Sequence, residues 1–208
     1  MSTQKHILLL AIALLVTSGA AVFAIRHIDE ATEAVRLATV FPEPAALPEF
    51  HMVDQDGVAF TRESLLGHPS LLFFGFTHCP DICPATLQQL AFARRELAGR
   101  PGNAARLPEI ILISVDPERD TTDILKAYTG HFGEGVTGVR GDAAELQKLA
   151  SALGIYYARE DSTGPDYTVS HSTAVLLINR EAELQALFTA PLDTEALVSD
   201  LQTLVDAG

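Results

Sequence analysis

Cys79 and Cys83 are the only cysteines in this 208-residue chain, and three residues separate them. The apolar run 71–76 predicts a buried strand just before them, and Pro80 and Pro84 predict a turn followed by the start of a helix. Both thiols are therefore expected between the end of a strand and the N-terminus of a helix. Because that end of a helix carries a partial positive charge, we expect it to favour the thiolate form.

Three chemistries fit a Cys-x-x-x-Cys pair: a soft-metal site, a reversible disulfide and a peroxidase-type thiol. The bland interpretation is two unrelated buried cysteines, which a strand-to-helix turn disfavours. The spacing differs from the Cys-x-x-Cys of redox sites, and a structural zinc site would need two further ligands. Two thiolates with one imidazole suit copper, because thiolates select Cu(I) and a histidine also allows Cu(II).

The N-terminal region predicts attachment to a membrane. Residues 7–25 carry no charge, and at about 1.5 Å per residue they are just long enough to cross a bilayer core. We expect a retained transmembrane anchor after a short N-terminus of residues 1–6, with a cleaved signal peptide as the alternative. Residues 26–48, which contain three prolines, are expected to be a tether, and residues 49–208 one domain.

The exported domain is expected in a compartment that permits disulfides. No Arg-rich, Ser-rich transit segment precedes the anchor, which favours a bacterial inner-membrane protein with a single span and a periplasmic C-terminal domain. The formal net charge is −13, from 14 basic and 27 acidic residues. A nucleic-acid partner is therefore not expected, because phosphate binding needs basic patches.

Strand and helix patterns alternate along the domain and predict a thioredoxin-like α/β fold with an N-terminal hairpin extension. The βαβ units imply a parallel core, and the last strand pair implies an antiparallel edge. The expected elements are a hairpin over 50–60 around Asp56-Gly57, strands over 70–76, 110–115, 136–139, 155–159, 173–178 and 184–188, and helices over 84–98, 121–131 (capped by Asp120 or Thr121), 143–153 and 193–205.

A copper site with two thiolates needs a further donor, and the chain has seven histidines. His171 is nominated because it follows a turn-rich loop and closely precedes a predicted strand. His78 adjoins Cys79, but neighbouring residues often point apart. The other five flank the anchor or lie at element ends, where a surface position is expected: His6, His27, His51, His68 and His131.

Three segments resemble the motifs of the SCO/SenC copper-chaperone family, in the same order. They are residues 74–84 (FGFTHCPDICP), 114–121 (SVDPERDT) and 166–172 (DYTVSHS). The resemblance implies a thioredoxin-like fold and copper, as Cu(I) or Cu(II), bound by Cys79, Cys83 and His171. One position departs from the family pattern: Ser170 stands where an acidic residue often precedes the histidine, and an acid there would orient the imidazole.

The resemblance also implies a function. Members assist assembly of the binuclear copper centre of a haem–copper (cytochrome c) oxidase, by delivering copper or by reducing the recipient's cysteines. The implied partners are the copper-centre subunit of that oxidase and another periplasmic copper chaperone. The alternative is a thiol–disulfide oxidoreductase acting on exported proteins through Cys79 and Cys83. A peroxidase ranks last, because no arginine near Cys79 in its motif supports a thiolate.

Overall fold

The computed structural model of the chain describes residues 35–102, 106–160 and 167–207. The strands in this part are β1 (Ala38–Ala46), β2 (His51–Asp54), β3 (Ala59–Thr61), β4 (Ser70–Gly75), β5 (Glu109–Ser114), β6 (Val136–Arg140), β7 (Tyr157–Arg159), β8 (Val169–His171), β9 (Val175–Ile178) and β10 (Glu183–Phe188). The helices are the 3-10 turn η1 (Arg62–Leu65) and α2 (Ile82–Ala98), α3 (Thr122–Thr129), α4 (Ala143–Ala152) and α5 (Thr194–Ala207).

The anchor predicted over residues 7–25 lies outside the described residues. Among the helices of the described part, none combines the length and the apolar character that crossing a bilayer requires.

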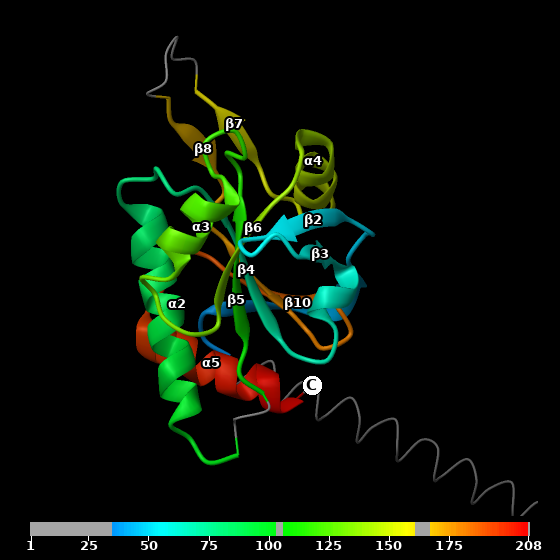
Figure 1. Cartoon of the computed structure of the whole chain (residues 1–208). Helices are drawn as coiled ribbons and strands as arrows, with labels where there is room; N and C mark the ends of the chain where they lie inside the picture. Colours follow the sequence, from blue (N-terminus) through cyan, green and yellow to red (C-terminus); the bar gives the residue numbers. More distant parts are fainter. Residues whose placement is uncertain (1–34, 103–105, 161–166, 208) are drawn as a thin grey trace, which may run out of the picture.

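Eight strands form one sheet in the order β1-β10-β9-β4-β5-β6-β2-β3 (Figure 1). Strands β4, β5 and β6 run parallel, and β9 and β10 continue the sheet in antiparallel fashion. The predicted parallel core and the antiparallel pairing of the last two strands are confirmed, but β1 rather than β10 forms the edge of the sheet on that side. Every residue of β4 and β9 is buried, as expected for apolar strands in the centre of a sheet covered on both faces. Helices α2, α3 and α5 lie on the side of the sheet opposite to α4 (Figure 1).

The predicted hairpin is present as β2 and β3, at the edge of the sheet beside β6. Gly57 has a φ of +77°, which a glycine adopts without strain. The Asp54 carboxylate accepts hydrogen bonds from the backbone N–H groups of Asp56 and Val58, at 2.8 and 2.9 Å. The hairpin predicted from Asp56-Gly57 is thus confirmed.

Part of the predicted tether belongs to the domain instead. Residues 38–46, assigned to the tether, form β1 and pair with β10. The register shifts between Val40 and Ala45, around Pro42 and Pro44, so neither proline has to donate to the ladder. An edge strand tolerates prolines that a central strand would not, and the proline content therefore misled the prediction.

A buried carboxylate fixes the entry to β1. Asp200 on α5 has no exposed surface and accepts three backbone N–H groups, from Arg36, Leu37 and Ala38, at 2.9, 2.7 and 2.9 Å. The residues involved are more than 160 positions apart in the chain. The domain therefore extends at least thirteen residues further toward the N-terminus, to Arg36, than the predicted boundary at residue 49.

Two further boundaries differ from expectation. Helix α2 begins at Ile82 rather than Pro84, which is possible because residues of the first turn need no intrahelical acceptor for their N–H groups. The predicted strand 155–159 is present as β7, but it pairs only with β8, in a separate two-stranded sheet. Thr121 caps α3 through its hydroxyl, and Asp120 has another role described below.

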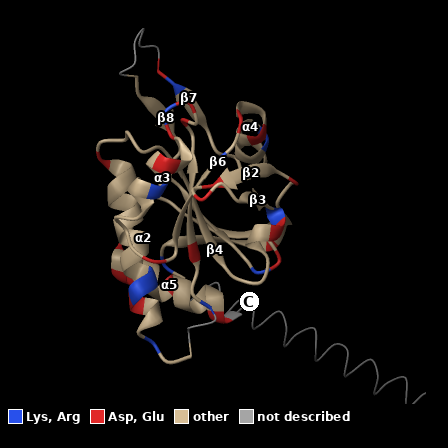
Figure 2. Cartoon of the chain, viewed as in Figure 1, with Lys and Arg blue, Asp and Glu red and all other residues tan. Residues whose placement is uncertain are grey.

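Charged residues are spread over several elements of the described domain. Figure 2 shows Lys and Arg in separate short segments among Asp and Glu on the helices and loops, without a continuous basic stripe on the coloured part of the chain. This distribution is in keeping with the acidic composition of the whole chain.

Candidate metal centre

The two cysteines lie at the connection between β4 and α2. The backbone N–H of Cys79 donates to the carbonyl of Phe76 at 3.3 Å, which turns the chain back after the strand. Cys83 falls in the first turn of α2 and has no exposed surface, while Cys79 is partly buried. Both thiols are free. The predicted position between a strand end and a helix is confirmed for Cys79, whereas Cys83 lies within the helix because α2 begins two residues earlier than predicted.

His171 reaches the site from β8, the strand opposite β7. Its ring packs edge-on against Phe73 and Phe76, with centroids 6.0 and 5.9 Å apart. Both phenylalanines come from β4 or the residue after it, so the strand that leads to Cys79 also forms the wall behind the imidazole.

Cys79, Cys83 and His171 converge. One potential ligand atom from each lies within 4.8 Å of the others, and Cys83 Sγ is 3.4 Å from His171 Nε2. Within residues 35–102, 106–160 and 167–207 no other cluster of three or more His, Cys, Asp or Glu side chains has this spacing. His78 lies beside Thr77 and Asp120 instead.

The imidazole of His171 is held in one orientation. Its Nδ1 lies 2.9 Å from the carbonyl oxygen of Ser172, and a carbonyl only accepts, so Nδ1 carries the proton. Nε2 then keeps its lone pair and faces Cys83. Burial lowers the pKa of His171, which favours this neutral, metal-binding form.

The Ser172 carbonyl orients the imidazole, which is the role expected of an acidic residue before His171. Ser170, which stands at that position, donates its hydroxyl to the carboxylate of Glu160 and does not touch the imidazole ring through any contact seen in the described residues. The departure from the family pattern therefore leaves the orientation of His171 intact.

The prediction that the helix N-terminus favours the thiolate form is wrong for Cys83. Burial raises the pKa of its thiol far above the ordinary range, and the neighbouring Cys79 and Asp120 raise it further. The loss of water around the sulfur thus outweighs the favourable end of the helix. Without a metal ion, Cys83 is a protonated thiol at neutral pH, which is a weak nucleophile.

A buried hydroxyl close to this region has no partner in the described part of the chain. Tyr128 Oη on α3 is fully buried and makes no hydrogen bond there. Burial raises the pKa of Tyr128, and the charges of Cys83 and Cys79 contribute in the same direction. An unpaired polar group in a dry interior costs free energy, so this hydroxyl is expected to lower the stability of the metal-free domain.

Two acidic residues near the site have structural partners that sequence reasoning did not find. Asp116, in the second motif, is buried and accepts a hydrogen bond from Tyr167. Asp120, a candidate helix cap, is fully buried and accepts from Thr77 and Ser114. Asp81 caps the start of α2 by position and is exposed. The one available signal was the motif 114–121, whose acidic residues have no local reason to be buried.

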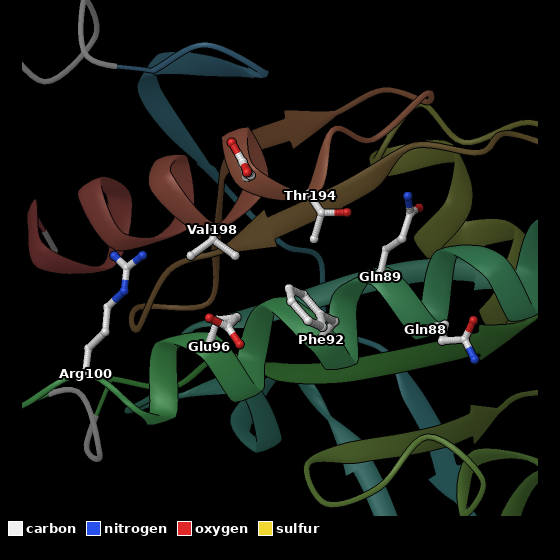
Figure 3. Close-up of a pocket in the computed structure, with 8 residues that line it drawn as sticks. Gln88, Gln89, Phe92, Glu96, Arg100, Thr194 and Val198 are labelled. Atoms are coloured by element: carbon white, nitrogen blue, oxygen red, sulfur yellow. The ribbon is translucent and has the colours of Figure 1, made fainter.

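A separate hollow of about 600 Å³ lies between α2 and α5. Phe92 from α2 faces Thr194 and Val198 from α5 across it (Figure 3). The remaining lining residues are Gln88, Gln89, Glu96, Arg100 and Glu195. None of these side chains is a thiol or an imidazole, so this hollow offers no soft-metal ligands.

The fold and the site define a class: an α/β domain of thioredoxin-like architecture with a preformed cluster of two thiols and one imidazole. A family model described as SCO1/SenC matches residues 41–206. The chain therefore belongs to the SCO1/SenC family, as its motifs indicated.

Two similar proteins illustrate this family membership. A Stutzerimonas stutzeri protein named for copper binding is 36% identical over 167 residues, which cover 80% of each chain. The mitochondrial SCO2 homologue of Homo sapiens is 36% identical over 151 residues, and the alignment covers 71% of this chain but 53% of that protein. The chain thus spans about half the length of this mitochondrial relative.

Solved structures of similar proteins share the fold of this chain. ScoI of Bradyrhizobium japonicum, solved with copper bound, is 35% identical with a TM-score of 0.67 and covers 76% of this chain and 98% of its own. ScoI of Arabidopsis thaliana, also solved with copper bound, is 31% identical with a TM-score of 0.71 and covers 78% and 99%.

Proposed function

We propose that this protein binds one copper ion as cargo, through Cys79, Cys83 and His171. The observation that carries the proposal is the convergence of the three ligand atoms within 4.8 Å, with the lone pair of His171 Nε2 directed at Cys83. Two soft sulfurs and one imidazole match the preferences of Cu(I), and the imidazole also supports Cu(II). Relatives at 31% and 35% identity, solved with copper bound, support the choice of metal.

The proposed role is assembly of the binuclear copper centre of a haem–copper oxidase. The partners are the copper-centre subunit, as recipient, and another periplasmic copper chaperone, as donor. Membership of the SCO1/SenC family supports this role. The protein is proposed to act at the bacterial inner membrane, held by residues 7–25, with the domain in the periplasm. The uncharged run 7–25 supports that location.

Each thiol has a separate part in this function. Partly buried Cys79 is the sulfur that an incoming ion or partner meets first, and buried Cys83 completes the site after it loses its proton. His171 enters as a neutral donor that is already oriented, so the chain spends little conformational entropy on binding. Phe73 and Phe76 keep water away from the imidazole.

The test is copper stoichiometry and the optical spectrum of the full chain in detergent, compared with its His171→Ala variant. One copper per chain is expected, with a thiolate-to-Cu(II) charge-transfer band that the variant loses. If binding and band both survived the substitution, His171 would not be a ligand.

The second candidate is a thiol–disulfide oxidoreductase. It is favoured by the same two free thiols, because both sulfurs belong to one cluster and Cys79 is less buried than Cys83. In that reaction the dithiol gives two electrons and two protons to a recipient disulfide and itself becomes a disulfide. His171→Ala separates the two functions, since exchange needs only the sulfurs. Protonated Cys83 weighs against a peroxidase.

A further inference from the structure

The strand that carries His171 is not part of the main sheet. β7 and β8 pair only with each other, over three residues each, among the described residues. A short two-stranded sheet is marginally stable in water. The position of His171 relative to the cysteines therefore depends on the short connection from β8 to β9 and on side-chain contacts between this small sheet and the rest of the domain.

A stack of three side chains supplies such a contact. The guanidinium carbons of Arg119 and Arg159 each lie 3.6 Å from the ring centroid of Tyr167. Two guanidinium groups cannot share one face at that distance, so the ring is sandwiched between them. Arg159 belongs to β7, and Tyr167 precedes β8, whereas Arg119 lies in the loop after β5. The stack thus joins the small sheet to the loop.

Hydrogen bonds and charge hold the stack together. The Tyr167 hydroxyl donates to one oxygen of buried Asp116, and Arg119 Nε donates to the other. Arg159 is 3.4 Å from Glu118 of the same loop. Cation–π contacts and buried charge-assisted hydrogen bonds are strong where water is excluded. Arg119 also lies 5.9 Å from the ring of Phe76, the residue whose ring packs against His171.

The same loop holds the cysteine side of the site. Asp120, with no exposed surface, accepts from Thr77 Oγ1 at 2.6 Å and from the Thr77 backbone N–H at 3.2 Å. Ser114 Oγ, at the end of β5, donates to Asp120 at 2.6 Å. Thr77 lies two residues before Cys79. The loop from Asp116 to Asp120 therefore contacts both halves of the metal cluster.

We propose that this loop sets the spacing between the thiols and the imidazole, with Arg119 as a positioning residue that acts through His171. The inference rests on the proposed copper function for its role, but the positioning itself is a property of the metal-free chain. Arg119 does not belong to the ligand cluster, but it contacts the Tyr167 ring just before β8 and lies near the Phe76 ring behind His171, and through these rings its influence on copper is expected to reach the imidazole.

The test is a double-mutant cycle on the full chain, with Arg119→Gln and His171→Ala alone and together, and with Cu(I) in a chelator competition as the probe. Arg119→Gln is expected to lower copper affinity about tenfold when His171 is present, which corresponds to about 1.4 kcal/mol. It is expected to change affinity less than about twofold when His171 is already replaced. A loss of equal size in both backgrounds, or no loss in either, would overturn the proposal.

Two variants act as matched comparisons. Tyr167→Phe keeps the ring in the stack and removes only its donor to Asp116, so a smaller loss than for Arg119→Gln is expected. Arg95→Gln removes another arginine that lies near an aromatic ring, Phe92, far along α2 from the thiols, and is expected to leave copper affinity unchanged. A loss for Arg95→Gln equal to that for Arg119→Gln would also overturn the proposal.

Amide hydrogen exchange of the metal-free chain separates failure of this inference from failure of the copper function. Arg119→Gln is expected to speed exchange in β7 and β8, where Arg159 pairs with Val169, and to leave exchange in the buried strand β9 unchanged. If no variant bound copper but this selective change occurred, the copper function would fall and the positioning would stand. Unchanged exchange in β7 and β8, or an equal change in β9, would refute the positioning itself.

Discussion

Replacement of Gly75 by alanine tests whether the position of the Cys83 sulfur limits copper binding. A Cβ atom at Gly75 would lie 2.9 Å from Cys83 Sγ, 3.0 Å from Phe73 Cε1 and 3.2 Å from Leu112 Cδ1. Ordinary carbon contacts are about 3.5–4.0 Å, so at least one neighbour has to move by about 0.5 Å or more. All three neighbours are fully buried, which leaves little room for the movement.

The magnitude follows from the cost of overpacking. Extra methyl groups in a close-packed interior cost about 1–3 kcal/mol, so the free energy of unfolding of Gly75→Ala is expected to fall by about that amount. In the metal-free protein the sulfur relieves part of this strain by moving away. Copper binding has to bring it back, so the part of the 1–3 kcal/mol that the moved sulfur relieves reappears as a loss of affinity, of up to about 150-fold.

Urea denaturation of the metal-free chain measures the first quantity, and Cu(I) competition with a chelator measures the second. Gly99→Ala is the control, because a Cβ there has its nearest neighbour, the carbonyl of Glu96, at an ordinary 3.5 Å. If Gly75→Ala matched Gly99→Ala in both measurements, the reasoning about close packing under Cys83 would be refuted. A loss of stability without a loss of affinity would mean that Phe73 or Leu112 yields instead of the sulfur.

Three other substitutions have defined expectations. Asp200→Ala leaves the three N–H groups at the start of β1 without their acceptor and is expected to cost about 3–5 kcal/mol in urea denaturation, with faster amide exchange in β1; a cost below about 1 kcal/mol would contradict this role. Thr121→Ala removes the cap that accepts from the Ile124 N–H and is expected to cost about 1 kcal/mol by the same assay, a value that Ser should largely restore. Tyr128→Phe removes a buried hydroxyl that has no partner in the described chain, so the metal-free protein is expected to be unchanged or more stable by up to about 1 kcal/mol, and a clear destabilisation would show that the hydroxyl is bonded.

The sequence alone was a good guide to elements that form from local pattern. The apolar run 71–76, the Asp56-Gly57 turn and the helix after the cysteines all rest on side-chain type and near neighbours, and each is present. Motif order nominated His171 as the partner of the two thiols, and the structure brings the three ligand atoms together.

Features that depend on distant partners were missed or misjudged. Residues 38–46 look like a tether in isolation and become a strand because β10 and Asp200 supply the partners. β7 has the pattern of a sheet strand, but it pairs only with β8, outside the main sheet. The helix N-terminus predicts a thiolate at Cys83, and complete burial reverses the result.

The chemistry of the site was thus determined by the sequence, because two cysteines at a strand-to-helix turn and a motif histidine are local facts. Its geometry was decided only by the tertiary structure. The distance from thiol to imidazole depends on a loop, residues 116–120, whose charged side chains are buried by contacts with Thr77 on one side and Tyr167 on the other. Burial and long-range pairing are properties of the whole packed domain, and no local pattern of residues encodes them.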